Sequence, residues 1–360
     1  MRKLFAGMTA GLLAVILAFS AQGLSAQSAV LMDADTGRVL HEKNADQQRL
    51  IASTTKIMTA LVICEQCNVL DRVRIPKEAV GVEGSSMYLQ EGEVLTVQEL
   101  LYGLMLRSGN DAAEALAIYC GGTVEGFAQL MNDKARQLGL EDTHFENPHG
   151  LDSPGHYSTA KDMAKLASYA MNNPIFAKTV SAKSVTVGQR VLQNHNKLLW
   201  QVEGADGVKT GYTKAAGRIL VSSAVRQGRR LIAVTMNAPD DWQDHKALLE
   251  QGFSQYTQEV LVRKGDVLGT VPIAGGTKAY VQLLAGEDFI CSVAQQEAAD
   301  IILPPRDFVY APVAMGQEAG FAHITLNDVP VGKVCLEYGE TIEIEQQPQK
   351  GFWERLLKGE

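Results

Sequence analysis

The hydrophobic positions of the chain follow strand spacing at its start and helix spacing after that. Apolar runs at residues 29–32 and 39–40 flank a polar segment, 33–37, that contains a glycine. This arrangement predicts a strand, a turn and a second strand. Between residues 53 and about 171 the apolar positions recur at helical spacing, so we expect a mostly helical region there.

Two helices of this region have clear end signals. Thr96 and Glu99 have the spacing of a capping box ahead of an apolar run, so one helix is predicted to begin at Thr96 and to stop near residues 108–109. Another is predicted to begin at residues 158–159, with an acidic residue in its first turn. It should end where the Asn-Asn-Pro sequence at 172–174 breaks the pattern.

Strand patterns return in the second half of the chain. Apolar runs at 217–225 and 231–236 flank Gln227-Gly228, a predicted hairpin turn, and a helix is expected from about 242 to 256. The strands of one sheet thus come from both sides of a helical insertion, which predicts a first domain of the α/β (α+β) class. Short β-rich runs broken by glycine and proline from 259 to 345 predict a second, all-β domain.

The N-terminus has the three parts of a secretory signal peptide. Two basic residues precede an apolar run at residues 4–19, and small residues follow up to Ala26. The apolar run is shorter than the roughly 20 residues that a membrane-spanning helix needs. We therefore expect removal near Gly23 or Ala26, which places the mature chain outside the cytoplasm.

These patterns divide the chain into four segments: a signal peptide at 1–26, a first domain at 27–257, a β-rich domain at 258–346 and a short amphipathic helix at 347–360. The helix is expected because four apolar residues share one face. Such a face can lie on a membrane surface or dock on the β-rich domain, and the sequence leaves both open. The four residues are Phe352, Trp353, Leu356 and Leu357.

Charge and cysteine content narrow the classes of function. The 360-residue chain has a formal net charge of -8, with acidic and basic residues interspersed, so no nucleic-acid partner is expected. The cysteines are too few and too scattered for a disulfide scaffold. Cys64 and Cys67 have the spacing of a redox motif, but their apolar helical surroundings favour buried thiols. The remaining cysteines are Cys120, Cys291 and Cys335.

The first candidate for chemistry is Ser53-Thr54-Thr55-Lys56, at the start of a helical pattern. A spacing of three places the Ser53 hydroxyl and the Lys56 amine on the same helix face. The amine can accept the serine proton only when it is neutral, a state that burial and a second nearby cation would favour. Alone the motif is weak, because a serine three residues before a lysine is common.

Two further motifs strengthen this interpretation. Ser108-Gly109-Asn110 lies where the first capped helix is predicted to end, and Lys209-Thr210-Gly211 lies on a predicted strand. Each could be ordinary, as a turn or as an edge strand with a solvated lysine. The three motifs in this order, with Asp in place of Gly109, are typical of penicillin-binding proteins and class A β-lactamases.

With these motifs the chain resembles the serine D-alanyl-D-alanine carboxypeptidases, the low-molecular-mass penicillin-binding proteins. The resemblance covers the mature chain to about Tyr256, and the β-rich domain with its tail resembles the C-terminal half of that family. Glycine at position 109 is typical of the carboxypeptidases rather than of most β-lactamases. The stretches that carry the resemblance are 108–113, 147–152, 157–160 and 207–213.

The resemblance implies that residues 27–257 form a D,D-peptidase domain. Ser53 would attack the carbonyl between the two terminal D-alanines of a peptidoglycan stem peptide, and Lys56 would take its proton. Ser108 would pass that proton to the leaving amine, while Asn110 would hold Lys56 and the substrate amide in register. The terminal D-alanine would leave through an acyl-enzyme, with no cofactor and no metal.

The resemblance also implies the binding residues. Lys209 and Thr210, in the element that ends at Gly211, would bind the terminal carboxylate. The backbone N–H groups of Ser53 and Tyr212 would form the oxyanion hole. β-Lactam antibiotics would acylate the same serine. Rapid antibiotic hydrolysis is not expected, because the chain has no counterpart of the Glu-x-x-Leu-Asn element of class A β-lactamases.

Three other functions would involve some of the same residues or chemistry. A zinc peptidase is disfavoured because His144, His149 and His156 lack a metal-ligand spacing such as His-Glu-x-x-His. A D,D-endopeptidase that cuts cross-links uses the same three motifs, and a non-catalytic sensor of penicillin or stem peptides would use the same serine. Residues 240–243 stand where some relatives have an arginine, so recognition of the carboxylate can differ in detail.

Overall fold

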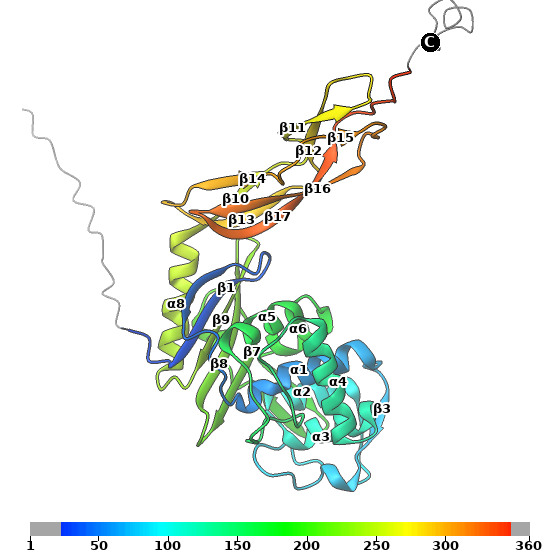
Figure 1. Ribbon diagram of the computed structural model, residues 1–360. Helices are drawn as coiled ribbons and strands as arrows, with labels where there is room; N and C mark the ends of the chain where they lie inside the picture. The colour runs from blue at the N-terminus through cyan, green and yellow to red at the C-terminus, as the bar shows by residue number, and fades with distance from the viewer. Residues whose placement is uncertain (1–22, 347–360) are drawn as a thin grey trace, which may run out of the picture.

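A computed structural model describes residues 23–346 (Figure 1). The first half of the architecture is a five-stranded antiparallel sheet in the order β2-β1-β9-β8-β7. Its strands come from both ends of the predicted first domain, as expected. They are β1 (Ser28–Asp33), β2 (Val39–Lys43), β7 (Ala205–Thr213), β8 (Gly217–Arg226) and β9 (Arg229–Met236).

A helical region is inserted between β2 and β7. The 3₁₀ turn η1 (Ala52–Thr55) opens it and leads directly into α1. Two short antiparallel strand pairs, β3–β4 and β5–β6, belong to it. The helices are α1 (Lys56–Gln66), α2 (Val97–Leu106), α3 (Asn110–Gly121), α4 (Val124–Gln137), α5 (Ala160–Met171), α6 (Pro174–Ser181) and α7 (Leu198–Gln201), with a second 3₁₀ turn, η2 (Lys77–Ala79); the short strands are β3 (Arg72–Arg74), β4 (Val94–Thr96), β5 (Ser184–Val187) and β6 (Arg190–Gln193).

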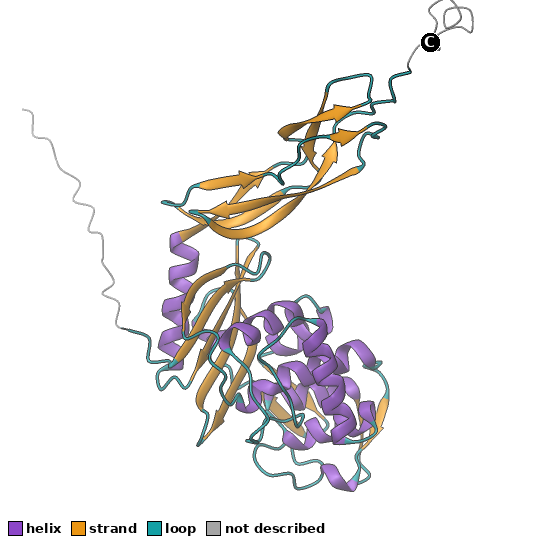
Figure 2. Cartoon of the chain, in the orientation of Figure 1, coloured by secondary structure: helices purple, strands orange, loops and turns teal. Residues whose placement is uncertain are grey.

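Both faces of the sheet are covered (Figure 2). Helix α8 (Asp241–Gln255) packs on one face, where Leu248 and Leu249 join Leu31 and Leu231 in a buried cluster. On the other face α5 contacts β1 and β9, and the main core continues from there into the helical region. The sheet therefore forms the middle layer of the first domain.

The helix starts predicted at Thr96 and at residues 158–159 are confirmed. Thr96 and Glu99 form a reciprocal capping box at the start of α2, and the Thr159 hydroxyl accepts from the Asp162 N–H at the start of α5. The residues that end α5 also begin the next helix: Asn173 caps α6, with Pro174 in its first turn.

The second part is all β. A two-stranded sheet, β10–β13, and a six-stranded sheet, β14-β16-β17-β12-β11-β15, form it. It extends from the end of α8 away from the helical region (Figure 1). Its strands are β10 (Tyr256–Val262), β11 (Val267–Ala274), β12 (Tyr280–Ala285), β13 (Phe289–Ala294), β14 (Ala299–Ile302), β15 (Val309–Tyr310), β16 (Glu318–Leu326) and β17 (Val329–Tyr338).

The chain changes from helix to strand between Gln255 and Tyr256 without a linker. The expected boundary between 257 and 258 stays a prediction. The expected amphipathic helix at 347–360 and residues 1–22 of the expected signal peptide lie outside the described residues. In residues 23–346 no helix is long and apolar enough to span a membrane.

Candidate active site

Ser53 and Lys56 lie together at the junction of η1 and α1. The Lys56 Nζ lies 3.1 Å from the Ser53 Oγ, and it donates to the Asn110 Oδ1 at 2.7 Å and to the backbone carbonyl of His149 at 2.6 Å. Lys56 is fully buried. Burial, with the nearby Lys209 in second place, holds the pKa of Lys56 well below its usual range, although Asp111 opposes the shift. The amine is therefore placed and tuned to accept the Ser53 proton.

Close backbone packing holds Ser53 in position. A Cβ on Gly211 would lie 3.3 Å from the Ser53 backbone nitrogen, so β7 passes directly beside η1. On the other side, a Cβ on Gly150, whose φ is +88°, would lie 1.8 Å from the Ala52 carbonyl oxygen. The contact at Gly150 requires glycine, and a side chain at Gly211 would press against the backbone beside Ser53.

The Ser108-Gly109-Asn110 element is the short connection between α2 and α3. Ser108 is buried and has a left-handed φ of 62°, which the surrounding structure must hold in place. Asn110 is the first residue of α3, and its Nδ2 donates to the Glu83 carbonyl at 2.5 Å. A Cβ on Gly109 would lie 2.7 Å from the Asp111 Oδ1, so an aspartate would not fit at this position without a rearrangement.

Asp111 fixes the loop that covers this element. Its carboxylate accepts from the backbone N–H groups of Met87 and Leu89 at 3.1 Å and from the Ser86 hydroxyl at 2.6 Å. Asp111 is almost fully buried, so these bonds satisfy a charge that would otherwise be costly to bury. The loop is thereby held above Asn110.

Lys209 lies on β7, beside the Ser53–Lys56 pair. It is only 2% exposed, and burial lowers its pKa to about 7. Its Nζ donates to the Thr210 carbonyl at 3.0 Å. Tyr212, two residues beyond Thr210, is 65% exposed. The strand thus runs from a buried amine next to the nucleophile to an open rim.

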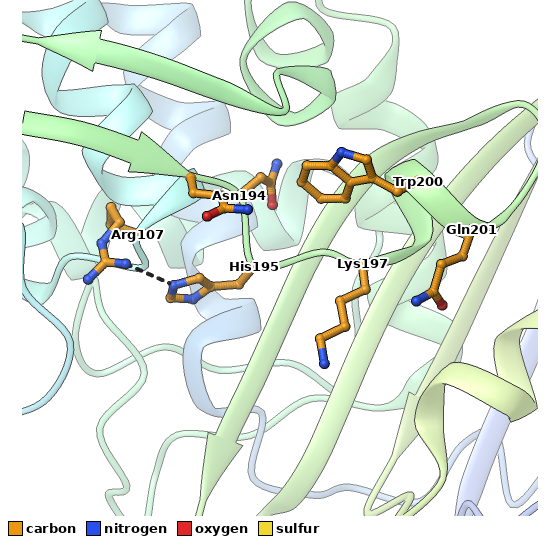
Figure 3. A pocket seen from close by; sticks show the side chains of 7 residues that line it. Arg107, Asn194, His195, Lys197, Trp200 and Gln201 are labelled. Carbon is orange, nitrogen blue, oxygen red and sulfur yellow. Dashed lines mark hydrogen bonds between the residues drawn. The ribbon is translucent and has the colours of Figure 1, made fainter.

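A cleft of about 670 Å³ adjoins the site. Arg107, the residue before Ser108, lies on one side of it, and Figure 3 shows its guanidinium pointing at the His195 ring. Burial, then Lys209 and Arg107, lowers the pKa of His195, so its imidazole is neutral while the neighbouring side chains carry the positive charge. The lining residues are Arg107, Gln193, Asn194, His195, Lys197, Trp200 and Gln201.

One cation at the rim was not identified from the sequence. Arg218 lies on β8 directly opposite Tyr212 and is paired with Asp241 through bonds of 2.7 and 2.9 Å. The Trp242 ring lies 5.7 Å from the Arg218 guanidinium and 6.0 Å from the Lys197 amine. Residues 240–243, which had no assigned role, therefore anchor an arginine that comes from the sheet.

The three histidines considered as metal ligands have other contacts. His156 bonds to the Thr55 hydroxyl at 2.7 Å, and His149 holds Lys56 through its carbonyl. Burial lowers the pKa of His149 to about 3 and that of His156 to about 4, so both are neutral. His144 contacts the Gly155 carbonyl. Within residues 23–346, no group of three or more His, Cys, Asp and Glu side chains could hold a metal ion.

The structure brings the three motifs to one site, from η1 and α1, from the α2–α3 connection and from β7. Besides Arg218, the His149 carbonyl and the Asp111 carboxylate are groups that sequence reasoning missed. Both lie in stretches that carry the resemblance, at 147–152 and 108–113. A backbone acceptor such as the His149 carbonyl leaves no residue-type signal in the sequence.

Comparisons with known proteins give consistent results. A family model described as D-alanyl-D-alanine carboxypeptidase, peptidase S11, matches residues 17–240, and one described as the C-terminal domain of penicillin-binding protein 5 matches residues 256–343. The D-alanyl-D-alanine carboxypeptidase DacF of Bacillus subtilis is 35% identical over 311 residues, which cover 82% of this chain and 80% of that protein. The carboxypeptidase DacD of Escherichia coli is 38% identical over 335 residues, which cover 87% and 86%.

Solved structures show the same architecture. Penicillin binding protein 5 from Haemophilus influenzae superposes with a TM-score of 0.79 at 32% identity, over 89% of this chain and 98% of that one. Penicillin binding protein 6B from Escherichia coli gives a TM-score of 0.70 at 32% identity, over 88% and 96%. Both similarities extend over the helical, sheet and all-β parts.

Proposed function

The chain belongs to the D-alanyl-D-alanine carboxypeptidase family. From this premise we propose that Ser53 is the nucleophile and Lys56 the base of a serine-type enzyme. The enzyme removes the terminal D-alanine from peptidoglycan stem pentapeptides. The observation that carries the proposal is the 3.1 Å contact between the Ser53 Oγ and the fully buried Lys56 Nζ. An amine kept neutral at this distance meets the first requirement for activating a serine.

Acylation follows from this contact. The Ser53 oxygen attacks the carbonyl between the two D-alanines while its proton passes to Lys56. Collapse of the tetrahedral intermediate breaks the peptide bond, and the leaving amine receives the proton through Ser108. Asn110, bonded to Lys56 at 2.7 Å, keeps the amine in line. Water, deprotonated by the same amine, then hydrolyses the ester and frees Ser53.

Charge and backbone donors on β7 suit the rest of the substrate. The N–H groups of Ser53 and Tyr212 stabilise the oxyanion. Lys209 and the Thr210 hydroxyl bind the terminal carboxylate, and Gly211 lets β7 lie close to η1. Once a carboxylate is bound, Lys209 gains an opposite charge that favours its protonated form. Arg107 and Lys197 in the cleft beside Ser108 add positive charge for an acidic peptide.

β-Lactams are the second class of ligand. Their strained amide takes the place of the scissile peptide bond, and opening of the ring leaves the acyl group on Ser53. Because the leaving nitrogen stays tethered to the acyl group, it remains in the site after the bond breaks. The adduct is therefore expected to last longer than the peptide intermediate.

The enzyme acts outside the cytoplasm in this proposal, with residues 1–26 as the export signal, and 27–257 and 258–346 as the two domains. The Asp244 carboxylate accepts from the Ser25 and Ala26 backbone N–H groups at 3.0 Å. These contacts favour removal near Gly23 over removal at Ala26, because only the former preserves both, and residues 24–26 of the expected signal then stay with the first domain. N-terminal sequencing of the secreted chain tests this choice.

Residues 347–360 are proposed to bind a membrane surface through their apolar face. The test is flotation of the full chain with vesicles that contain anionic lipid, beside a chain that ends at residue 346. The full chain should float with the vesicles and the shortened one should not. Equal behaviour of the two would contradict membrane binding.

The central experiment is incubation of the enzyme with a pentapeptide that ends in two D-alanines, beside a Ser53→Ala control. Wild type should release D-alanine, and the control should release none above background. A cross-linked stem-peptide dimer in a parallel reaction separates the endopeptidase alternative, which predicts cleaved dimer. A stable fluorescent-penicillin adduct with neither product would support the sensor alternative.

A further inference from the structure

Two cysteines outside the active site lie at the far ends of the two helices that carry it. Cys67 is the residue that ends α1, and Cys120 is next to last in α3. Helices α1 and α3 pack against each other. Both cysteines are partly exposed, and both contact the main core. Neither has a role in the chemistry derived above.

The two side chains belong to one cluster of contacts. The Cys67 and Cys120 thiols lie close enough to shift each other's pKa, which is raised for Cys67 and lowered for Cys120. Next to them, the Tyr119 hydroxyl donates to the Asp71 carboxylate at 2.8 Å, which ties the end of α3 to the loop that follows α1. The backbone of Cys67 is extended, with φ -117° and ψ 147°, so its side chain leaves the helical register that Cys64 keeps.

We propose that Cys67 and Cys120 form a disulfide bond that joins the ends of α1 and α3. This pairing differs from the one that the spacing of Cys64 and Cys67 would suggest. Cys64 is buried inside α1 and keeps the helical register, so its thiol is shielded from an exchange partner, whereas Cys67 and Cys120 are both partly exposed. The neighbouring Cys67 thiol lowers the pKa of Cys120, which favours Cys120 as the attacking thiolate.

The chemistry is an exchange with a small-molecule disulfide, for which oxidised glutathione is the probe. The Cys120 thiolate attacks one glutathione sulfur, the glutathione disulfide breaks, and one glutathione thiolate leaves. The Cys67 thiolate then attacks the Cys120 sulfur and displaces the second glutathione. The two cysteines lose two protons and two electrons in total, and the glutathione disulfide gains them. In the cell, formation of this disulfide depends on the export proposed above, because disulfides persist in oxidising compartments.

The bond would stabilise the domain without entering the active site. The two cysteines are 53 positions apart, so the cross-link removes considerable freedom from the unfolded chain. An eleven-residue α1 separates Cys67 from Ser53 by roughly 16 Å along the helix axis. Oxidation is therefore expected to raise the melting temperature and to leave the release of D-alanine within about twofold at 25 °C.

The test uses the purified full chain, equilibrated with oxidised glutathione, alkylated under denaturing conditions and digested for mass spectrometry. The expected result is a reducible peptide pair that contains Cys67 and Cys120, while Cys64, Cys291 and Cys335 carry the alkyl label. Recovery of Cys67 or Cys120 as alkylated thiols would overturn the proposal. A Cys64–Cys67 pair would overturn it as well.

Variants separate the bond from other effects of the oxidant. Wild type should melt on the order of 5 °C higher after oxidation than after reduction. Cys67→Ser and Cys120→Ser should show no such difference, and Cys64→Ala should keep it. A cross-linked wild type with an unchanged melting temperature would contradict the stabilising role.

Discussion

At the scale of single residues, the proposed mechanism needs two buried amines in opposite protonation states. Lys56 must be neutral to accept the Ser53 proton, whereas Lys209 must be charged to bind a carboxylate. Burial lowers the pKa of both, and for Lys56 the charge of Lys209 lowers it further. The pKa of Lys56 therefore sets the lower limit of the pH range in which the enzyme is active, and the pKa of Lys209 sets the upper limit.

This arrangement predicts a bell-shaped pH profile of kcat/KM. On the acid side, activity falls as Lys56 takes up a proton. On the alkaline side, it falls as the pH rises through about 7, where free Lys209 loses its charge. The profile is measured by D-alanine release under conditions where the substrate does not saturate the enzyme.

The matched variant for this prediction is Lys209→Arg. A guanidinium stays charged throughout the range, so the acid side should remain and the alkaline fall should disappear. If the alkaline fall persists unchanged in Lys209→Arg, that limb belongs to another group and the role given to Lys209 is wrong.

At the scale of elements, one buried histidine connects α8 to the sheet. His245 is fully buried between the Ser222 hydroxyl at 2.6 Å and the Thr235 hydroxyl at 2.9 Å, on β8 and β9. Burial lowers its pKa to about 3. The imidazole is neutral in the fold, where it satisfies two polar groups that would otherwise be buried without partners.

The variant His245→Leu should lower the free energy of unfolding at pH 7 by roughly 2–4 kcal/mol, because two hydroxyls lose their partner. The loss should shrink by up to about 2 kcal/mol at pH 5, because the unfolded wild type takes up a proton on His245 at that pH and the folded protein does not. The folded-state pKa of His245 is depressed, so its contribution is complete above the unfolded value near 6.5 and declines as the pH falls toward 3.

Urea unfolding at the two pH values measures both effects. The exposed His323 offers a control: His323→Leu should change the free energy of unfolding by less than about 0.5 kcal/mol at either pH. A cost of His245→Leu that grows on acidification would contradict the assignment of a neutral buried imidazole.

The elements that could be predicted from the sequence are those with local signals. The caps at Thr96 and Thr159 and the Gln227-Gly228 turn are each formed by neighbouring residues, and the turn has positive φ at both positions. The missed contacts are non-local. The His149 carbonyl reaches Lys56 across 93 positions, and Arg218 pairs with Asp241 from another element. Such contacts depend on the tertiary fold, which residue patterns do not encode directly.

At the scale of the whole molecule, a polar contact joins the all-β part to the sheet. The buried Ser292 of β13 accepts from the Arg229 Nη1 at 3.1 Å and donates to the Asp33 carboxylate. Beside it, Arg38 bonds to the Ser292 carbonyl and pairs with Glu297. Because the chain also passes directly from α8 into β10, the two parts are held in a fixed relation.

The variant Ser292→Val should loosen this contact, because Asp33 and Arg229 lose their shared partner. We expect faster proteolytic cleavage near the α8–β10 junction and an unchanged kcat/KM for D-alanine release. Thr325→Val is the control, since the Thr325 hydroxyl is buried without a partner and its removal costs little. Equal proteolysis of the two variants would contradict a role of Ser292 in joining the domains.

Formation of the acyl-enzyme on Ser53 can be measured by mass spectrometry of the enzyme after brief exposure to benzylpenicillin. We expect one adduct per chain, mapped by digestion to Ser53, and none in a folded Ser53→Ala variant. An adduct on any other residue, or equal labelling of the variant, would contradict acylation at Ser53.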